Sequence, residues 1–577
     1  MTILYLWLEK YNTFENLNVN FGGRYIFNFN QIENKLEMKE NPHYIDKFFD
    51  IVELNSNSEI SLLTGIVGSN GTGKTTLIEV LRNIFTEKYE DLNFKFILVT
   101  KNDGKVKVLS NLENNLSIPT IGIRVEKNHS EKKSIIFIST IFDRKIEKSR
   151  DNEINLSTNY LLKNINMDSY ESAKIRQDLA FLQFNNKHRL LDDVEFKLPE
   201  KLIVHILDTL SNEKIDKSLS LSDKIIDQKN RFIINIQYNF VNYALNIIDH
   251  WLEVEVLYKQ DSRNVEKVRR LIDVKNEIKN YKSWDYLREQ LNFYKQGKHN
   301  NINLLVNLMH FVDKIIDTTE HSKDFEVKIE SDSSFSLSSN KEIFDFIQLY
   351  SKNVVGSRDF FGFQWRSLST GEESLLDIFS RIFQSSKKTM SRKWSEEIII
   401  FIDEVENNLH PHWQKQIVNH LLRIIKLLFK NKKIHLILTS HSPFIISDIP
   451  HTNIIMLERN GDISNVKENI EDLERTFAGN IHTLLAHSFF MKNGLMGTFS
   501  KEKINKVYSQ IINSDRNELL LNRVILEKQI NIISEPLIRN KLLSELENRL
   551  KLDIHDEILI LKERLQNLEN ISYDKNK

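Results

Sequence analysis

Residues 68–76 read Gly-Ser-Asn-Gly-Thr-Gly-Lys-Thr-Thr and match the pattern Gly-x-x-x-x-Gly-Lys-Ser/Thr. Glycine has no Cβ atom, so backbone N–H groups can wrap closely around an anion. The apolar run at 60–67 predicts a buried strand before this segment, and the periodicity of 75–85 predicts a helix after it. A helix N-terminus adds N–H donors and a favourable dipole. We therefore expect residues 68–76, the P-loop, to bind the phosphates of a nucleotide.

Two side chains of the P-loop have specific expected roles. Lys74 is expected to contact the β- and γ-phosphates, and the Thr75 hydroxyl is expected to bind Mg²⁺. The expected cofactors are therefore ATP and Mg²⁺. The nucleotide contacts expected from this loop are Gly68, Ser69, Asn70, Gly71, Thr72, Gly73, Lys74, Thr75 and Thr76.

A second candidate is the pair Asp403 and Glu404, which follows five apolar residues at 398–402. Such a run predicts a central parallel strand, and sites in α/β folds lie at the C-terminal ends of these strands. Asp403 is expected to hold Mg²⁺, and Glu404 to orient or deprotonate the attacking water. An acidic pair after an apolar run is common, so by itself it does not indicate a catalytic site. Together with the P-loop earlier in the chain it does.

Two further segments allow both a chemical and a structural interpretation. His441 follows the apolar strand predicted at 434–438 and would reach a γ-phosphate, although a histidine at such a place is more often structural. At 365–374, Ser369 is suited to an N-cap and Gly371 to close backbone approach. A turn and a cap before a helix are the more common explanation of those two residues.

Taken in their order along the chain, these four segments resemble the head of an ABC-type ATPase. Residues 368–372, Leu-Ser-Thr-Gly-Glu, stand for the ABC signature, residues 407–410 for the D-loop, and His441 for the switch histidine. Thr370 replaces the first signature glycine, Glu372 the usual glutamine, and His410 the usual aspartate of the D-loop. These changes do not remove the groups that the chemistry uses.

The resemblance implies that ATP is bound between two copies of the chain. The signature of one copy would cap ATP on the P-loop of the other, so a head-to-tail homodimer or a higher homo-oligomer is expected. The catalytic residues would be Glu404 and His441. The glutamine that senses Mg²⁺ in this family is unassigned, and Gln177 and Gln183 are candidates by location. The contacts expected across the interface are Ser369, Gly371 and Glu372.

The composition excludes several classes of protein. The chain has 577 residues, a formal net charge of −1 and no cysteine. This balance of charge excludes a uniformly basic nucleic-acid binder, and the lack of cysteine excludes disulfides and thiolate metal sites. No apolar run approaches the roughly 20 residues that span a bilayer, so we expect a cytoplasmic protein without membrane contact. The length is too great for a single hydrophobic core.

Four regions are expected to position the site in an α/β fold. An ABC-ATPase head, with a P-loop sheet and an antiparallel β subdomain, would comprise 1–142 and 356–465. The stretch between them, 143–355, reads as a large helical insertion, and 466–577 as a helical C-terminal region. The basic segment 385–393 reads as a loop, either solvated or in contact with DNA or a partner.

Shorter strings narrow the resemblance to the stand-alone ABC-type AAA family ATPases of bacterial antiphage defence. They lie at 403–411, 440–448, 5–9 and 477–490. This group includes the ATPase subunits of Septu systems, the PtuA family, which also occur in retron systems. The resemblance implies a separate HNH nuclease partner of the PtuB kind. In a retron it also implies a reverse transcriptase and its RNA–DNA product.

A nuclease centre within the chain is not expected. Only 136 residues follow His441, and the sequence contains neither a Toprim arrangement nor an HNH-like cluster. Two other functions stay open: an SMC- or OLD-like DNA-repair or DNA-processing ATPase, and an assembly module that binds nucleotide with negligible turnover. Residues 143–355 lack sustained heptads, which disfavours the first. The intact Glu404 disfavours the second.

Overall fold

In the computed structural model the chain divides into two compact units, Met1–Phe489 and Phe490–Lys577. The structure describes residues 1–50, 56–102, 105–112, 116–118, 123–126, 134–163, 167–189, 199–207, 227–258, 272–273, 276, 284–295, 300–320, 328–338, 340–353, 360–366, 368–392, 394–467, 475–482, 484, 496–550, 558, 562 and 565–566. Within these ranges, none of the helices combines the length and apolar character that crossing a bilayer requires.

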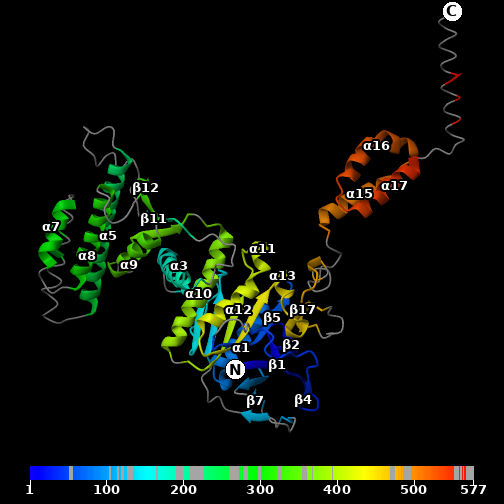
Figure 1. Cartoon of the computed structure of the whole chain (residues 1–577), viewed down its shortest axis with the longest axis horizontal. Helices are drawn as coiled ribbons and strands as arrows, with labels where there is room; N and C mark the ends of the chain where they lie inside the picture. The colour runs from blue at the N-terminus through cyan, green and yellow to red at the C-terminus, as the bar shows by residue number, and fades with distance from the viewer. Residues whose placement is uncertain are drawn as a thin grey trace, which may run out of the picture. The chain divides into compact units, whose positions relative to one another are not determined.

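The first unit is built on one large sheet. Its strands are β1 (Thr2–Tyr11), β2 (Phe14–Asn20), β5 (Glu59–Gly68), β6 (Phe96–Asn102), β7 (Lys105–Ser110), β8 (Ile123–Glu126), β9 (Ser134–Ser139), β10 (Glu153–Ser157), β15 (Glu397–Asp403), β16 (Lys433–Ser440), β17 (Ile454–Asn460) and β18 (Ile463–Val466). The spatial order is β10-β9-β15-β16-β5-β17-β18-β2-β1-β6-β7-β8. Figure 1 labels β5, β17, β2, β1 and β7 of this sheet. From β10 to β17 neighbouring strands are parallel. Around β1 and β6 the pairing is antiparallel.

The strand predicted at 398–402 is confirmed as a central parallel strand. It is β15, which lies between β9 and β16 and is buried along its whole length. A strand covered on both faces favours a continuous run of β-branched and aromatic residues, as the run Ile-Ile-Ile-Phe-Ile provides. The mixed α/β fold expected from the sequence is therefore present.

Helices cover this sheet and complete its hydrophobic core. They are α1 (Lys74–Thr86), α2 (Thr158–Leu161), α10 (Thr370–Ser391), α11 (Pro411–Gln414), α12 (Ile417–Leu428) and α13 (Pro443–Ile446), with short 3-10 turns η1 (Tyr89–Asp91) and η2 (His451–Asn453). Helix α1 begins at Lys74, within the P-loop, and its Leu77 and Ile84 share one core cluster with Ile66 of β5 and Phe401 of β15. Packing therefore fixes the P-loop helix against the strands that carry the candidate site.

A small hairpin, β3 (Tyr25–Asn30) and β4 (Lys35–Glu40), packs on the antiparallel part of the large sheet. Phe29 of the hairpin meets Trp7 of β1 with ring centroids 4.7 Å apart in an edge-to-face arrangement. Such aromatic pairs add to the stability that burial alone provides. The hairpin belongs to the first unit.

The region 143–355 differs in part from the mainly helical prediction. Its helices are α3 (Met167–His188), α5 (Gln228–Tyr258), α7 (Trp284–Lys295), α8 (Asn300–Glu320) and α9 (Asn340–Asn353). It also contains β10, which pairs with β9 in the large sheet. A second sheet of order β12-β13-β11-β14 is formed by β11 (Leu202–Ile206), β12 (Lys328–Ser331), β13 (Ser334–Leu337) and β14 (Phe361–Trp365). Strands β12 and β13 form a tight hairpin, but β11 pairs with β13 and β14 across long stretches of sequence, which local patterns do not reveal.

The prediction of a basic loop at 385–393 is wrong, because α10 continues to Ser391. Two side chains in this stretch bond to carbonyls of the preceding helical turn. The Ser385 hydroxyl donates to the Ile382 carbonyl at 2.7 Å, and the Thr389 hydroxyl donates to the Ser385 carbonyl at 2.7 Å. Polar residues that are satisfied in this way are compatible with a helix interior. Residue 393 lies outside the described residues.

Helix α3 is joined to β14 and α10 through a buried carboxyl group. Asp178 accepts hydrogen bonds from Trp365 Nε1 of β14 at 3.2 Å and from Ser380 Oγ of α10 at 2.8 Å. Burial raises the pKa of Asp178 to about 7, Lys174 opposes this rise, and Asp377 adds to it. The carboxyl is therefore a pH-sensitive link between α3, β14 and α10.

Replacing Asp178 by asparagine is expected to make the Tm of the first unit less dependent on pH. The unfolded chain loses this proton near the ordinary pKa of 3.8, whereas the folded chain keeps it up to about 7. The wild-type protein therefore loses stability as pH rises through this window, and the amide does not ionise. Thermal unfolding at several pH values between these limits should show the variant becoming more stable relative to wild type as pH rises. Parallel pH profiles would contradict the assignment.

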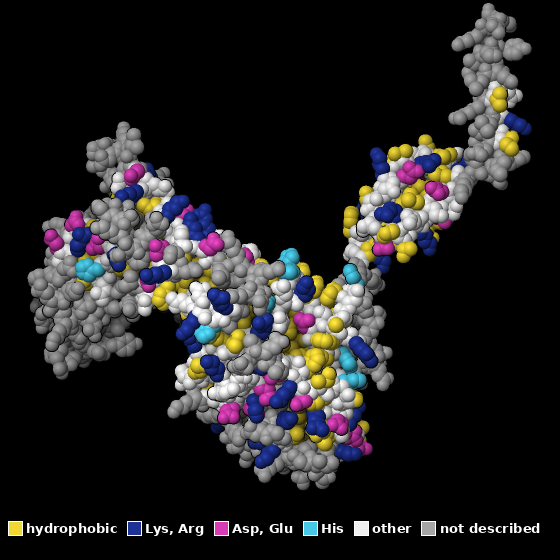
Figure 2. Space-filling model, viewed as in Figure 1, with side chains coloured by type: hydrophobic (Ala, Val, Ile, Leu, Met, Phe, Trp, Pro, Cys, Tyr) yellow, Lys and Arg dark blue, Asp and Glu magenta, His cyan; other side chains and the backbone are white. Residues whose placement is uncertain are grey.

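In the described residues of the second unit lie the helices α15 (Thr498–Asn513), α16 (Arg516–Asn531) and α17 (Pro536–Leu550). They share a small core that includes Ile511, Leu526 and Leu546. Hydrophobic side chains also gather on the outer surface of these helices (Figure 2), and Leu521 of α16 is 84% exposed. The helical character predicted for this part of the chain is present in the described residues.

Candidate nucleotide-binding site

Three neighbouring parallel strands bring the candidate residues to one edge of the sheet. Strands β15, β16 and β5 are adjacent, with Ile402 opposite Leu438 and Ser440 opposite Val67. Their C-terminal ends therefore lie together. The P-loop follows β5, Asp403 ends β15, and His441 follows β16. This edge is where α/β folds place their ligands.

The P-loop borders a pocket of about 620 Å³. Its lining residues are Asn12, Thr13, Asn70, Gly71, Gly73, Lys74, Thr75, Thr76, Lys145, Glu404 and His441. Other P-loop residues support the loop: the Thr72 hydroxyl donates to the Ser69 carbonyl at 2.9 Å, and the Gly68 and Ser69 carbonyls accept from Lys74. The structure thus brings the P-loop, Glu404 and His441 to one cavity.

The backbone of the P-loop requires glycine at residue 73. Gly73 has a φ of 94° and is the residue before α1, which begins at Lys74. A Cβ atom there would come 2.6 Å from the Phe14 ring. Glycine tolerates both the positive φ and the close contact, so the helix N-terminus can face the pocket.

Lys74 lies at the base of the pocket with only 6% of its surface exposed. Its Nζ donates to the carbonyls of Gly68 at 3.1 Å and Ser69 at 3.2 Å. Burial lowers the pKa of Lys74, and the nearby carboxylates Glu404 and Asp403 oppose this effect. A buried cation in a loop of backbone donors is suited to binding phosphate.

Thr75 and Asp403 form the part of the site that fits a magnesium ion. The Thr75 hydroxyl donates to Asp403 Oδ2 at 3.2 Å, and the Thr439 hydroxyl donates to Asp403 Oδ1 at 2.5 Å. Burial raises the pKa of Asp403, and the hydrogen bond from Thr439 opposes the rise. One carboxylate and one hydroxyl, completed by phosphate oxygens and water, form the oxygen donor set that Mg²⁺ prefers. Among the described residues no cluster of three or more His, Asp or Glu side chains is arranged to hold a metal ion.

Glu404 is held at the mouth of the pocket in an unusual backbone conformation. Its φ is 47°, and its N–H donates to the Thr439 hydroxyl at 2.7 Å. Such left-handed residues cluster at functional sites when the surroundings enforce them. The His441 imidazole lowers the pKa of Glu404 more than burial raises it, and the charges of Lys74 and Lys145 lower it further. The side chain is therefore an ionised acceptor at neutral pH.

His441 lies between the candidate base and the phosphate-binding lysine. Its Nε2 is 3.7 Å from Glu404 Oε1, and its Nδ1 is 3.5 Å from Lys74 Nζ. Its backbone N–H donates to Glu406 Oε1 in a short hydrogen bond. Glu406 is a residue that the sequence did not single out, and burial raises its pKa. It lies two residues after Glu404 and fixes the start of the segment that carries His441.

Comparison with known proteins supports this interpretation of the fold. A family model described as "AAA domain, putative AbiEii toxin, Type IV TA system" matches residues 63–447, which is more than half of the chain. The chain belongs to this AAA-domain family. An AAA domain indicates an ATPase, and such domains bind nucleotide, typically with Mg²⁺.

A curated relative adds a narrower similarity. The chain is 26% identical to the Septu protein PtuA of Bacillus mycoides (strain KBAB4) over 200 residues. The match covers 32% of this chain and 26% of that protein, so it spans about a quarter of the relative's length. The resemblance to PtuA proteins expected from the sequence is confirmed.

Residues 368–372, expected from the sequence to form a signature, lie outside the P-loop pocket of their own chain. Ser369 caps α10: its hydroxyl accepts from the Glu372 N–H at 3.3 Å, and Glu372 Oε2 accepts from the Ser369 N–H at 2.7 Å. The predicted N-cap is confirmed as a full capping box. A Cβ atom on Gly371 would come 2.7 Å from the Trp413 ring, so Gly371 permits close packing there. Ser369 and Gly371 line a separate depression.

That depression has a volume of about 690 Å³ and contains residues of the predicted D-loop. Its lining residues are Ser369, Gly371, Asn408, Leu409, His410, His412 and Trp413. None of them lines the P-loop pocket described above. Trp413 had no distinguishing pattern in the sequence, and only the close approach to Gly371 reveals its place.

The two candidate glutamines do not reach the pocket. Gln177 and Gln183 lie on α3, which packs against α10 and β14, and neither lines the P-loop pocket. Lys145 lines it instead, from a segment without regular structure after β9. No sequence pattern marked this lysine, because its position depends on contacts with distant residues.

Proposed function

We propose that the chain binds ATP and Mg²⁺ in the P-loop pocket and hydrolyses ATP as the regulatory subunit of a bacterial antiphage system of the Septu type. The observation that supports this most strongly is the convergence of three pairs at one edge of the sheet. Lys74 lies beside His441, Thr75 faces Asp403, and Glu404 lies beside His441. Together they supply phosphate binding, metal binding and a base.

Each residue has a role in this mechanism. The P-loop N–H groups and Lys74 bind and orient the phosphates. Mg²⁺, held by Thr75 and Asp403, would supply charge neutralisation at the β- and γ-phosphates. Glu404 accepts a proton from the attacking water or orients that water for attack. His441 holds the Glu404 carboxylate and faces the terminal phosphate.

An ABC-type head-to-tail dimer is part of this proposal. Ser369 and Gly371 lie in a depression apart from the P-loop pocket of the same chain. They would therefore reach ATP only on a second copy, where the α10 N-terminus and the capping hydroxyl would meet the γ-phosphate. The division of the chain into an ATPase head, an insertion and a C-terminal region belongs to the same proposal.

The partners follow from the similarity to PtuA. We propose that the ATPase controls a separate HNH nuclease of the PtuB kind in the cytoplasm, and in a retron also contacts a reverse transcriptase and its RNA–DNA product. The alternative, an SMC- or OLD-like DNA-processing ATPase, is disfavoured because the longest helix among the described residues is α5, with 31 residues. Coiled-coil arms of the SMC kind would need much longer helices.

The charge distribution bears on the same alternative. On the face visible in Figure 2, Lys and Arg side chains are interspersed with Asp and Glu and do not form a continuous basic surface.

Mass photometry tests the proposed dimer. The full chain carrying Glu404→Gln should form a dimer or larger complex with ATP and Mg²⁺ that persists, whereas wild type should form it transiently. Co-expression with the neighbouring genes of its native locus should bring a small HNH protein with the ATPase. If assembly is the same with and without nucleotide in both proteins, the sandwich mechanism is wrong. Strong stimulation of ATP hydrolysis by DNA without a nuclease partner would favour the DNA-processing alternative.

A further inference from the structure

A lysine that no motif predicts lines the P-loop pocket from a segment outside the P-loop. Lys145 belongs to the segment 140–150, which joins β9 to β10 without regular secondary structure. It lines the pocket together with Lys74, Glu404 and His441. A loop without helical or strand hydrogen bonds holds a side chain in place only if other contacts fix its backbone. Such contacts are therefore needed if Lys145 is to bind a ligand in the pocket.

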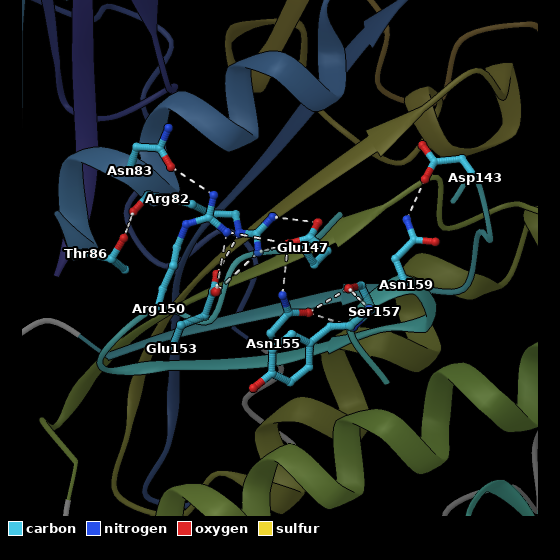
Figure 3. Close-up of polar contacts among 11 residues, drawn as sticks. Arg82, Asn83, Thr86, Asp143, Glu147, Arg150, Glu153, Asn155, Ser157 and Asn159 are labelled. Atoms are coloured by element: carbon cyan, nitrogen blue, oxygen red, sulfur yellow. Dashed lines mark hydrogen bonds and ion pairs between the residues drawn. The ribbon is translucent and has the colours of Figure 1, made fainter. Parts of the chain in front are cut away.

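A buried network joins this segment to the P-loop helix (Figure 3). Arg82 of α1 donates through Nη2 to Glu147 Oε2 at 2.9 Å and through Nε to Glu153 Oε1 at 2.6 Å. Arg82 is 4% exposed and Glu153 is fully buried. Arg150 Nη2 donates to Asn83 Oδ1 of α1 at 2.9 Å, and Asn155 Nδ2 donates to Glu147 Oε2 at 3.1 Å. The segment is therefore tied to the helix that begins at Lys74.

A second set of contacts fixes the segment close to Lys145 itself. Asp143 Oδ1 accepts from the Lys145 backbone N–H at 3.1 Å and from the Asn159 side chain. Lys145 Nζ pairs with Asp143 Oδ2 at 2.8 Å. This ion pair is exposed, so it is weak and readily exchanged for a stronger anion. The backbone is anchored, while the ammonium group is free to change partner.

The charged groups near Lys145 indicate to which end of the pocket its ammonium group is close. The pKa of Lys145 is raised by Asp143 first, and Asp403 and Glu79 also raise it. In turn, Lys145 helps to lower the pKa of Glu404. Glu404 and Thr75 line the pocket, and Thr75 meets Asp403 there, so this is the end where the metal and the terminal phosphate would lie. Asn12 and Thr13 line the pocket from the turn between β1 and β2.

We propose that Lys145 is a second phosphate-binding cation of this site, which exchanges Asp143 for the terminal phosphate of a bound nucleoside triphosphate. The inference rests on the proposed function, since it requires nucleotide in the P-loop pocket. Lys74 contacts the phosphates from the P-loop, and Lys145 contacts them from the anchored segment after β9. The site therefore distinguishes triphosphate from diphosphate partly through a side chain outside the motifs.

Equilibrium binding to the full chain tests this, with the β,γ-imido analogue of ATP and with ADP, both in the presence of Mg²⁺. Lys145→Ala should weaken binding of the imido analogue about ten-fold, the size expected for one lost charge-assisted hydrogen bond. Binding of ADP should be nearly unchanged. Lys145→Arg should restore most of the difference. Lys148→Ala is the matched control, because Lys148 is exposed in the same segment and does not line the pocket.

The ratio of the two affinities separates a phosphate contact from a structural effect. Equal weakening of both ligands by Lys145→Ala, or no weakening of either, would overturn the inference while leaving the proposed function intact. A wild-type chain that binds neither nucleotide would overturn both. Because Lys145 is exposed, its replacement is not expected to disturb folding, and a Tm equal to that of wild type would verify this.

Discussion

The Glu404→Gln variant is expected to hydrolyse ATP about 100- to 10,000-fold more slowly than wild type, the range for loss of a general base. Glutamine keeps the size of the side chain but cannot accept the proton of the attacking water. The His441 imidazole and the charges of Lys74 and Lys145 hold the pKa of Glu404 below its ordinary value, so the wild-type carboxylate is ionised and ready to act. Release of phosphate from ATP measures the rate directly.

Binding should survive this change, since Glu404 is not one of the P-loop contacts to phosphate. ATP affinity measured by calorimetry is therefore expected to stay within a few-fold of wild type. Glu396→Gln is a suitable control, because Glu396 is exposed just before the opposite end of β15. This variant should hydrolyse ATP at the wild-type rate. If Glu404→Gln and Glu396→Gln have the same turnover, Glu404 is not the base.

Replacing Arg82 by alanine is expected to lower the free energy of unfolding of the first unit by about 3–5 kcal/mol. The cost is large because Glu153, fully buried, would lose the guanidinium that compensates its charge. The Arg82 guanidinium also lies 3.8 Å from the centre of the Phe137 ring, and this contact would be lost as well. Urea unfolding followed by near-UV circular dichroism would measure the difference.

A matched exposed pair provides the control for Arg82. Arg24 and Glu40 are 3.3 Å apart with side chains 57% and 67% exposed, so Arg24→Ala should cost less than about 1 kcal/mol. Arg82→Lys keeps the charge but not the forked geometry of the guanidinium. Its loss in free energy of unfolding should therefore lie between those of Arg82→Ala and Arg24→Ala. A loss for Arg82→Ala no larger than that for Arg24→Ala would show that the buried network does not stabilise the unit.

The contiguous parts of the site were predictable from the sequence. The P-loop between a buried strand and a helix, and the acidic pair at the end of an apolar run, are local patterns, and both form where they were expected. The Ser369 N-cap was also predictable, because a capping residue and its partner Glu372 are three positions apart. In these cases the residues that determine the structure are neighbours in the chain.

The parts that were missed depend on contacts between distant residues. Strand β10 joins the large sheet by pairing with β9, although its surroundings suggested a helical insertion. Lys145 enters the pocket because Arg82, more than sixty positions earlier, anchors Glu147. Glu406 was missed because it acts through the backbone of His441, and side-chain patterns do not show backbone hydrogen bonds.

The most direct test of the central claim, that the P-loop pocket binds ATP, is calorimetric titration of ATP with Mg²⁺ into wild type and Lys74→Ala. The account predicts one nucleotide bound per chain for wild type and loss of binding for Lys74→Ala, with Lys148→Ala behaving as wild type. Equal binding by wild type and Lys74→Ala, or no binding by wild type, would contradict it.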